Sequence, residues 1–266
     1  MQLNHKIRKV GRDFRTRVRK RARPRLTSLE RPKPLVFAVW PPADSPVSVR
    51  TWLREVAAVG RLNAYPPTFP EDAARGRGQT IIVLPGFCAQ DTSTIRLRNF
   101  LIGQGFDAQP WDCGPNLGPT RSVLSSLERL VDEAAAKQGR PVALVGVSLG
   151  GTIAREIAKR RPDCVARIVT MVSPIKLPVA SPLAPLARFA ALVWDGDARD
   201  AIARVAEPPP VPLTAIVNPK DGVLDWRACL PEPAPNVEVV SIEGSHMTMG
   251  SNPNVQRVVA ARLALD

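Results

Sequence analysis

The sequence predicts an α/β fold over residues 79–266, in which a mostly parallel β-sheet carries helices on both faces. Two observations support this fold class. Continuous apolar runs alternate with amphipathic segments throughout the range, which is typical of buried parallel strands joined by crossover helices. In addition, the segment VGVSLGG at residues 145–151 places one serine among glycines, between such a strand and such a helix.

The predicted elements follow one another in a regular order. Strands are expected at Thr80–Pro85, Phe106–Trp111, Pro141–Val147, Cys164–Ser173, Pro212–Asn218 and Asn236–Ile242. Helices are expected at Asp91–Gly105, Thr120–Lys137, Leu149–Arg160 and Asn254–Leu265. In the helix that follows the serine, Arg155 and Glu156 are expected to face solvent because its apolar residues occupy the opposite face.

One segment, at about residues 174–211, interrupts this alternation. It is rich in proline and contains the apolar stretch Leu186–Trp194. We interpret it as a short cap, inserted between two strands, that would cover a site at the edge of the sheet. Its apolar side chains either contact a substrate or pack in the core, and both interpretations stay open. The candidate pocket residues in the cap are Leu186, Phe189 and Trp194.

Two N-terminal regions precede the sheet. Residues 1–33 hold 13 of the 37 Lys and Arg residues but only two of the 24 acidic ones, so this arm carries +11 of the net charge of +13. The arm is expected to be either a flexible, solvated tail or a basic amphipathic helix that binds an anionic membrane or another polyanion. Residues 34–78 are expected to form an extension with one helix, at Ser48–Leu62, that packs on or near the main domain.

The remaining composition excludes several classes of function. Outside the arm the charge is nearly balanced, so we expect no specific nucleic-acid recognition by the folded part. The four cysteines and two histidines are scattered, which argues against a zinc site and favours reduced cysteines packed as small apolar residues. No apolar run approaches the ~20 residues of a membrane helix. Because no secretion signal is seen either, we expect a cytoplasmic protein, free or peripheral to the membrane.

The VGVSLGG segment fits the pattern Gly-x-Ser-x-Gly, with Gly146, Ser148 and Gly150. A nucleophile on a sharp strand-to-helix turn brings two backbone segments close together, so the positions two before and two after it must lack side chains. The helix behind the serine also offers unpaired N–H groups to a negatively charged oxygen. The pattern therefore predicts a nucleophilic serine.

A nucleophilic serine requires a base, and the base requires an acid that orients it. His5 lies in the arm, so His246 is the candidate base. It follows the last predicted strand, and ligand sites of α/β sheets lie at such strand ends. Asp221 stands in a turn after the preceding strand and is the favoured acid. Asp225 is the alternative, although its place suits an N-cap for the segment that follows.

The oxygen that becomes negatively charged during attack requires N–H donors. The backbone N–H of Leu149 is one candidate. The other is that of Phe87, in the loop after the first predicted strand, where Gly86 would permit the turn. Cys88 and Gln90 are candidates for the lining of the pocket because they lie in the same loop.

Together these motifs resemble the α/β-hydrolase superfamily, in particular bacterial esterases and lipases. The segments VLPGF, GVSLGG, NPKDGVLDW and GSHMTMGSNP occur in the order of the family over about residues 79–266. The segment WDCGPNLGP at Trp111–Pro119, which contains Asn116, resembles a stretch that lies near the site of lipase-like members. Where many members have His-Gly, this chain has Pro85-Gly86.

The resemblance implies a serine hydrolase without a cofactor or metal. Its residues would be Ser148 as nucleophile, His246 as base and then acid, Asp221 as orienting residue, and the amides of Phe87 and Leu149 as oxyanion donors. The expected substrate is a small carboxylic ester with an apolar acyl part. An acyltransferase or thioesterase would use the same triad and differs only in the acceptor or in the bond cleaved. A non-enzymatic scaffold whose basic arm binds a partner is the third hypothesis.

Overall fold

The computed structural model describes residues 38–39, 41–64 and 69–265. The predictions for the basic arm, residues 1–33, therefore fall outside the described residues. The described residues form one compact unit. The helix predicted in the extension thus belongs to the same unit as the sheet.

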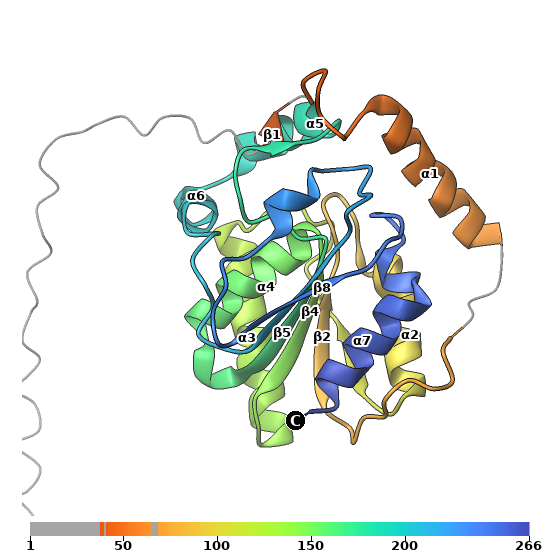
Figure 1. Cartoon of the computed structure of the whole chain (residues 1–266). Coiled ribbons are helices and arrows are strands. Elements are labelled where there is room, and N and C mark those ends of the chain that lie inside the picture. The colour runs from red at the N-terminus through yellow and green to blue at the C-terminus, as the bar shows by residue number, and fades with distance from the viewer. Residues whose placement is uncertain (1–37, 40, 65–68, 266) are drawn as a thin grey trace, which may run out of the picture. The chain divides into compact units, whose positions relative to one another are not determined.

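Six parallel strands form the main sheet (Figure 1). They are β2 (Thr80–Leu84), β3 (Asp107–Pro110), β4 (Val142–Val147), β5 (Val165–Met171), β7 (Leu213–Val217) and β8 (Val237–Ser241). Their order across the sheet is β3-β2-β4-β5-β7-β8. The chain runs outward in one direction after β2 and in the other after β4. The loops that follow β2 and β4 therefore meet at the point where the strand order reverses, which is where open α/β sheets bind ligands.

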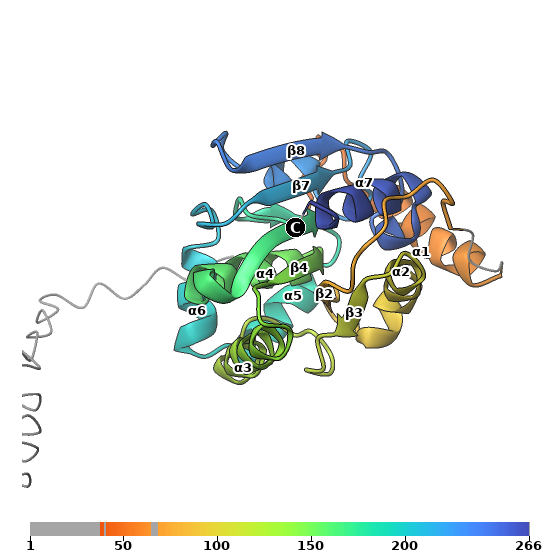
Figure 2. The ribbon, with the colours of Figure 1, turned by 90° about the horizontal axis from the view of Figure 1, so that it is seen from below.

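Helices cover both faces of the sheet, as Figure 2 shows in a view from below. On one face, α2 (Asp91–Gly103) and α7 (Pro253–Leu263) pack against side chains such as Ile81 and Val83. On the other face, α3 (Arg121–Gln138) and α4 (Leu149–Arg160) pack against Ile82 and Leu84. Alternate residues of one fully buried strand thus enter two different cores, which explains the continuous apolar runs in the sequence.

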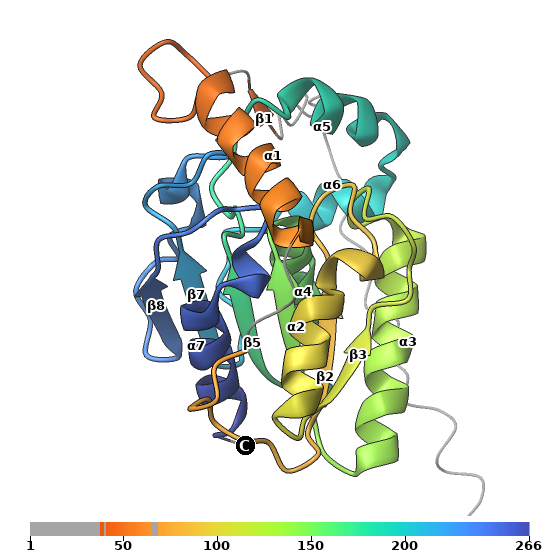
Figure 3. The ribbon, with the colours of Figure 1, turned by 90° about the vertical axis from the view of Figure 1, so that its right-hand side faces the viewer.

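The extension contributes β1 (Ala38–Val39) and α1 (Val49–Ala64). A reciprocal cap begins α1: the Ser48 backbone N–H donates to Thr51 Oγ1 at 2.8 Å, and the Thr51 N–H donates to Ser48 Oγ at 3.2 Å. In Figures 1 and 3, α1 lies on the side of the sheet that carries α2 and α7. The sequence predicted this helix but not what it contacts.

The cap segment holds β6 (Val179–Ala180), α5 (Ala184–Ala190), a 3₁₀ turn at Ala191–Val193 and α6 (Gly196–Ala203). Strands β1 and β6 pair in parallel, so the extension and the cap are joined by a two-stranded sheet that the sequence did not predict. Ala184, Ala187 and Ala198 of the cap belong to the core on the α3 and α4 face. Much of the cap therefore packs as core.

The prediction that Arg155 and Glu156 face solvent is wrong. Both side chains are buried, with exposed fractions of 2% and 3%. The segment at the end of α6 covers this face of α4, and an Nη2 donor of Arg155 reaches the carbonyl oxygen of Glu207 at 3.0 Å. Burial lowers the pKa of the Arg155 guanidinium to about 10.

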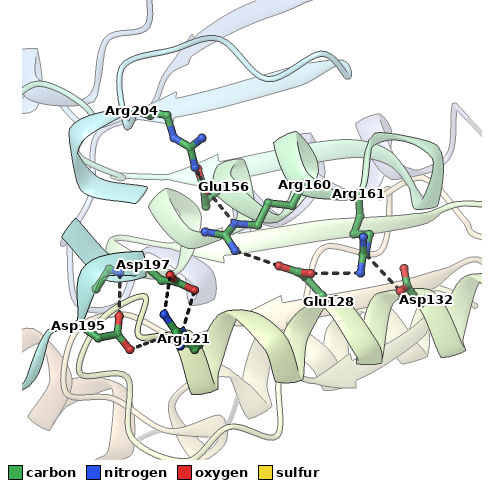
Figure 4. A network of polar contacts seen from close by, with 10 residues as sticks. Arg121, Glu128, Asp132, Glu156, Arg160, Arg161, Asp195, Asp197 and Arg204 are labelled. Carbon is green, nitrogen blue, oxygen red and sulfur yellow. Dashed lines mark hydrogen bonds and ion pairs between the residues drawn. The ribbon is translucent and has the colours of Figure 1, made fainter. Parts of the chain in front are cut away.

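Glu156 is the centre of an ionic network that links helices, which Figure 4 shows. One of its carboxylate oxygens accepts from Arg160 Nε at 2.8 Å and from Arg204 Nη2 at 2.6 Å. Arg160 also donates to Glu128 of α3 at 3.1 Å, and Arg161 pairs with Glu128 at 3.1 Å. We call Glu128, Glu156, Arg160, Arg161 and Arg204 the α4 network.

Candidate active site

Ser148 occupies a strained turn between β4 and α4. Its φ is 51° and its ψ is −123°, a region that costs a residue other than glycine about 1–3 kcal/mol. The Ser148 backbone N–H donates to the carbonyl oxygen of Met171 at 2.8 Å, at the end of the neighbouring strand β5. The turn is thus held by the sheet, and the serine is presented at the edge where the strands end.

The glycines around Ser148 leave no room for side chains. A Cβ atom on Gly146 would lie 2.3 Å from the Cα atom of Gly151, and one on Gly150 would lie 2.4 Å from the carbonyl oxygen of Pro85. Gly151 is equally restricted, since a Cβ atom there would lie 2.1 Å from Ser173 Oγ. The sequence pattern contains the first two glycines. The third is required by a contact with Ser173, in the segment just after β5, which the pattern does not contain.

Asp221 and His246 form a buried hydrogen-bonded pair. Asp221 lies in the loop after β7 and His246 in the loop after β8. The distance between His246 Nδ1 and Asp221 Oδ2 is 2.6 Å. The other oxygen of Asp221 accepts from the backbone N–H groups of Val223 at 2.8 Å and Leu224 at 3.0 Å. The carboxylate is therefore fixed by its own turn and accepts from the imidazole with its remaining oxygen.

The environment of His246 raises its pKa above the ordinary value. Burial by itself would lower it, because an imidazolium is poorly solvated in the protein interior. The charge and hydrogen bond of Asp221 outweigh burial, and the charge of Glu55 adds to them. Asp225, the alternative acid, instead caps the 3₁₀ turn at Trp226–Cys229, where its Oδ1 accepts from the Arg227 N–H at 3.0 Å.

The two residues with candidate oxyanion donors, Phe87 and Leu149, line the same hollow as Ser148. Neither the Phe87 nor the Leu149 backbone N–H is a donor in any hydrogen bond found among the described residues. The loop that contains Phe87 is held by Asn116. Its side-chain Nδ2 donates to the Pro85 carbonyl at 2.7 Å, and its backbone carbonyl accepts from the Cys88 N–H at 2.8 Å. The backbone N–H groups of Phe87 and Leu149 thus have no hydrogen-bond partner among the described residues.

The role predicted for Gly86 is wrong. A Cβ atom there would make only ordinary contact, 3.5 Å from the Cβ atom of Ser148. The residue of this loop with a left-handed conformation is Cys88, whose φ is 58°. A side chain at position 86 would occupy space over the serine, so glycine here keeps the site open rather than permitting the turn.

Comparisons with known proteins identify the fold of this chain. Residues 101–215 match a family model described as the alpha/beta hydrolase fold. The monoacylglycerol lipase of Paleococcus ferrophilus superimposes with a TM-score of 0.54, at 16% identity over 76% of this chain and 99% of that one. A structure from the metagenome-derived lipolytic enzymes LipS and LipT gives 0.55, at 14% identity over 75% and 100%. This chain has the α/β-hydrolase fold. The predicted fold class and resemblance are therefore confirmed.

A third structure with the α/β-hydrolase fold extends the comparison. A soluble variant of the Saccharomyces cerevisiae monoglyceride lipase, in complex with a substrate analogue, has a TM-score of 0.51 at 15% identity, over 75% of this chain and 88% of that one. No curated protein sequence matches this chain. The likeness is thus one of fold, at low sequence identity.

A cavity of about 250 Å³ opens beside Ser148 and His246 within this hydrolase fold. Most of its wall is apolar and comes from α1, α2, the cap and the loops after β7 and β8: Val59, Leu62, Leu97, Leu183, Val223 and Met247. A second, smaller hollow of about 40 Å³ also reaches Ser148 and shares Phe87, Leu183 and Val223 with the first. The serine therefore stands between a larger and a smaller apolar space.

The six candidate pocket residues lie elsewhere, because none of them lines either cavity. Asn116 is fully buried and holds the Phe87 loop, and Trp194 is buried with Nε1 donating to the Leu117 carbonyl at 2.8 Å. The side chains in exposed positions are Cys88, Gln90, Leu186 and Phe189. The sequence had left two roles open for the apolar cap residues; Leu186 and Phe189 are not buried in the core, and they line neither cavity.

Several residues that shape the site were not predicted. Val59 and Leu62 of α1 line the cavity. Asn218 joins the loop after β7, which contains Asp221, to the loop after β8, which contains His246, since its Nδ2 donates to the Gly244 carbonyl at 2.8 Å. Glu55 of α1 contacts both loops. The only signal in the sequence was the strong helical period of Ser48–Leu62, which indicates a buried face but not its neighbours.

All four cysteines are free; Cys229 is buried as predicted, whereas Cys88 is exposed and contradicts the expected core packing. Among the described residues, no group of three or more His, Cys, Asp or Glu side chains is arranged to hold a metal ion. Within the same part of the chain, no helix has both the length and the apolar character needed to cross a membrane.

Proposed function

We propose that this chain is a serine hydrolase that cleaves a carboxylic ester through an acyl-enzyme intermediate. One observation carries the proposal: the strained Ser148 and His246, whose Nδ1 is hydrogen-bonded to the buried Asp221, both line one apolar cavity. An acid that orients an imidazole, an imidazole that accepts a proton and a hydroxyl that attacks are the three parts of a catalytic triad.

The first half of the reaction forms the acyl-enzyme. Because His246 Nδ1 donates to Asp221, Nε2 is the atom that accepts a proton from Ser148. The freed Oγ attacks the ester carbonyl, and the resulting oxyanion accepts from the Phe87 and Leu149 N–H groups. When the tetrahedral intermediate collapses, the bond to the alcohol oxygen breaks, and the alcohol leaves with the proton held by His246.

The second half releases the acid. His246 accepts a proton from a water molecule, whose oxygen attacks the acyl carbon on Ser148 Oγ. The second intermediate uses the same two N–H donors. On its collapse Oγ regains the proton from His246 and the carboxylic acid departs. Water and the side chains named here supply every group in this reaction, so it requires no cofactor.

The two hollows beside Ser148 favour an ester with unequal substituents. The cavity of about 250 Å³ is somewhat smaller than the ~300–1,000 Å³ of sites for drug-sized ligands. We assign it to the acyl part, since its wall is mostly apolar, and the hollow of about 40 Å³ to a small alcohol part. Two of the structures with this fold are described as monoacylglycerol or monoglyceride lipases, which is compatible with an apolar acyl group here.

Hydrolysis of p-nitrophenyl esters with graded acyl length tests the proposal. We expect turnover to rise with acyl length until the cavity is filled and then to fall. Leu62→Trp, which narrows the cavity, should move this optimum to shorter chains. Release of nitrophenol with an equal amount of free acid supports a hydrolase. An acyltransferase would instead release much less free acid than nitrophenol, because it would transfer the acyl group to an added alcohol or amine.

A further inference from the structure

A second buried carboxylate lies beside the candidate triad. Glu55, on α1, is only 4% exposed. Its Oε1 accepts from the backbone N–H of Gly222 at 3.0 Å. Its Oε2 accepts from the hydroxyl of Ser245 and from the backbone N–H of Met247 at 3.4 Å. Gly222 directly follows Asp221, and Ser245 and Met247 flank His246, so one side chain touches both loops of the pair.

The contact between α1 and the acid loop is close. A Cβ atom on Gly222 would lie 2.8 Å from Glu55 Oε1 and 2.8 Å from the carbonyl oxygen of Thr51. The neighbours of Glu55 on α1, Leu53 and Val56, are largely exposed. The carboxylate is therefore buried by the loops rather than by the helix, and its three hydrogen bonds offset the cost of removing it from water.

We propose that Glu55 is a positioning residue that fixes the Asp221 loop and the His246 loop relative to each other. It also holds α1 where Val59 and Leu62 form a wall of the cavity. This inference rests on the proposed function, because positioning matters only if His246 acts as the base. It extends the site to a helix that lies outside residues 101–215, the segment that matches the family model.

The charge of Glu55 provides a measurable consequence. The charged groups that face His246 are Asp221 and Glu55, and both raise its pKa against the effect of burial. Three cationic residues, Arg54, Arg61 and Lys220, line a hollow together with Glu55, but none of them donates a hydrogen bond to its carboxylate. The hydrogen bonds that Glu55 accepts come from neutral groups. A neutral side chain of the same shape at this position should therefore lower the pKa of His246.

The test is a titration of the histidine imidazoles by NMR in the full chain, with Glu55→Gln beside the wild type. The chain has only two histidines, so His5 provides an internal reference. Glu128→Gln is the matched control. It also removes a carboxylate that accepts hydrogen bonds, but this carboxylate belongs to the α4 network. Thermal unfolding of each variant shows whether it is folded.

We expect Glu55→Gln to lower the pKa of His246 while that of His5 stays constant, and Glu128→Gln to change neither. In steady-state hydrolysis, Glu55→Gln should reduce kcat by about tenfold with little change in KM, the fold-change expected for loss of about one hydrogen bond to a charged group. The acid limb of its kcat/KM profile should move to lower pH.

Two outcomes overturn the inference. One is a folded Glu55→Gln protein whose His246 titrates as in the wild type. The other is a wild-type kcat in that variant. If Glu55→Gln does not fold, Ser245→Ala replaces it: removing this donor should reduce kcat severalfold, and an unchanged kcat counts against the proposal. A wild type that hydrolyses no ester would contradict the proposed function. In that case the NMR titration would still measure the effect of Glu55 on the pKa of His246.

Discussion

Two glutamates on two helices are buried to the same extent but have opposite surroundings. Glu55 of α1 is 4% exposed and Glu156 of α4 is 3% exposed. Glu55 accepts from two backbone N–H groups and a hydroxyl, whereas Glu156 accepts from Arg160 and Arg204 and lies 3.6 Å from Lys159 Nζ. The first carboxylate has neutral partners and the second has cationic ones.

This difference separates a functional role from a structural one. The cations around Glu156 balance its charge, so the α4 network joins helices with little effect on distant groups. Neutral donors solvate Glu55 without cancelling its charge, and that charge acts on His246. Changes around His246 should therefore affect turnover more than folding, and changes in the α4 network should affect folding more than turnover.

The largest effect on turnover among acid substitutions should come from Asp221→Asn. The amide can no longer hold the imidazole in the required tautomer, so kcat should fall on the order of 10⁴-fold while the protein stays folded. Asp225→Asn is the matched control, since that residue caps a short turn, and it should keep kcat close to wild type. Steady-state kinetics checks both. A larger loss in Asp225→Asn would assign the acid to Asp225.

The largest effect on stability should come from Glu156→Ala. Removing this buried carboxylate leaves Arg160 and Arg204 without a shared partner. Because Arg204 is about half exposed and Arg160 keeps its contact with Glu128, the loss should be roughly 1.5–3 kcal/mol of unfolding free energy, the cost of losing a hydrogen bond to a charged group. Urea denaturation measures the loss. At a temperature where the variant is folded, its kcat should be close to wild type. A stable variant with a low kcat would reverse the roles assigned to the two glutamates.

The pH dependence of kcat/KM should show the raised pKa of His246. The neutral imidazole accepts the proton of Ser148, so activity is lost as the pH falls through this pKa. Because the pKa is raised, the midpoint of the acid limb should lie above the ordinary value of about 6.5. A midpoint below 6.5 would mean that burial outweighs the two carboxylates.

The smallest effect should come from Phe189→Ser in the cap. This side chain is 71% exposed and lines neither cavity, and such surface substitutions usually change stability by less than about 0.5 kcal/mol. Ester hydrolysis with long acyl chains should be unchanged. A selective loss on long chains would show that Phe189 meets the substrate, as the sequence had suggested.

Local features were predictable from the sequence and contacts between distant segments were not. The helix Leu149–Arg160 has the bounds that its pattern predicts, because apolar spacing and the elbow glycines act within a few residues. The placement of Ser148, Asp221 and His246 at strand ends follows from parallel topology. Arg155 and Glu156 were misplaced because their burial depends on α6, which is 40 residues further along the chain.

The same reason explains the missing parts of the pocket. Val59, Leu62 and Glu55 reach the site only because α1 packs against the loops after β7 and β8. Helical period predicts that a helix has a buried face, but the partner of that face is a tertiary property. Candidates chosen for nearness in sequence, such as Cys88 and Gln90, point to solvent instead.

The most direct test of the central claim is whether Ser148 is an activated nucleophile. Intact-mass spectrometry after treatment with a fluorophosphonate answers this without knowledge of the substrate. We expect one adduct on the wild type, located on Ser148 by peptide mapping, and none on Ser148→Ala. An unmodified wild type, or an equal adduct on Ser148→Ala, would contradict the assignment of this serine.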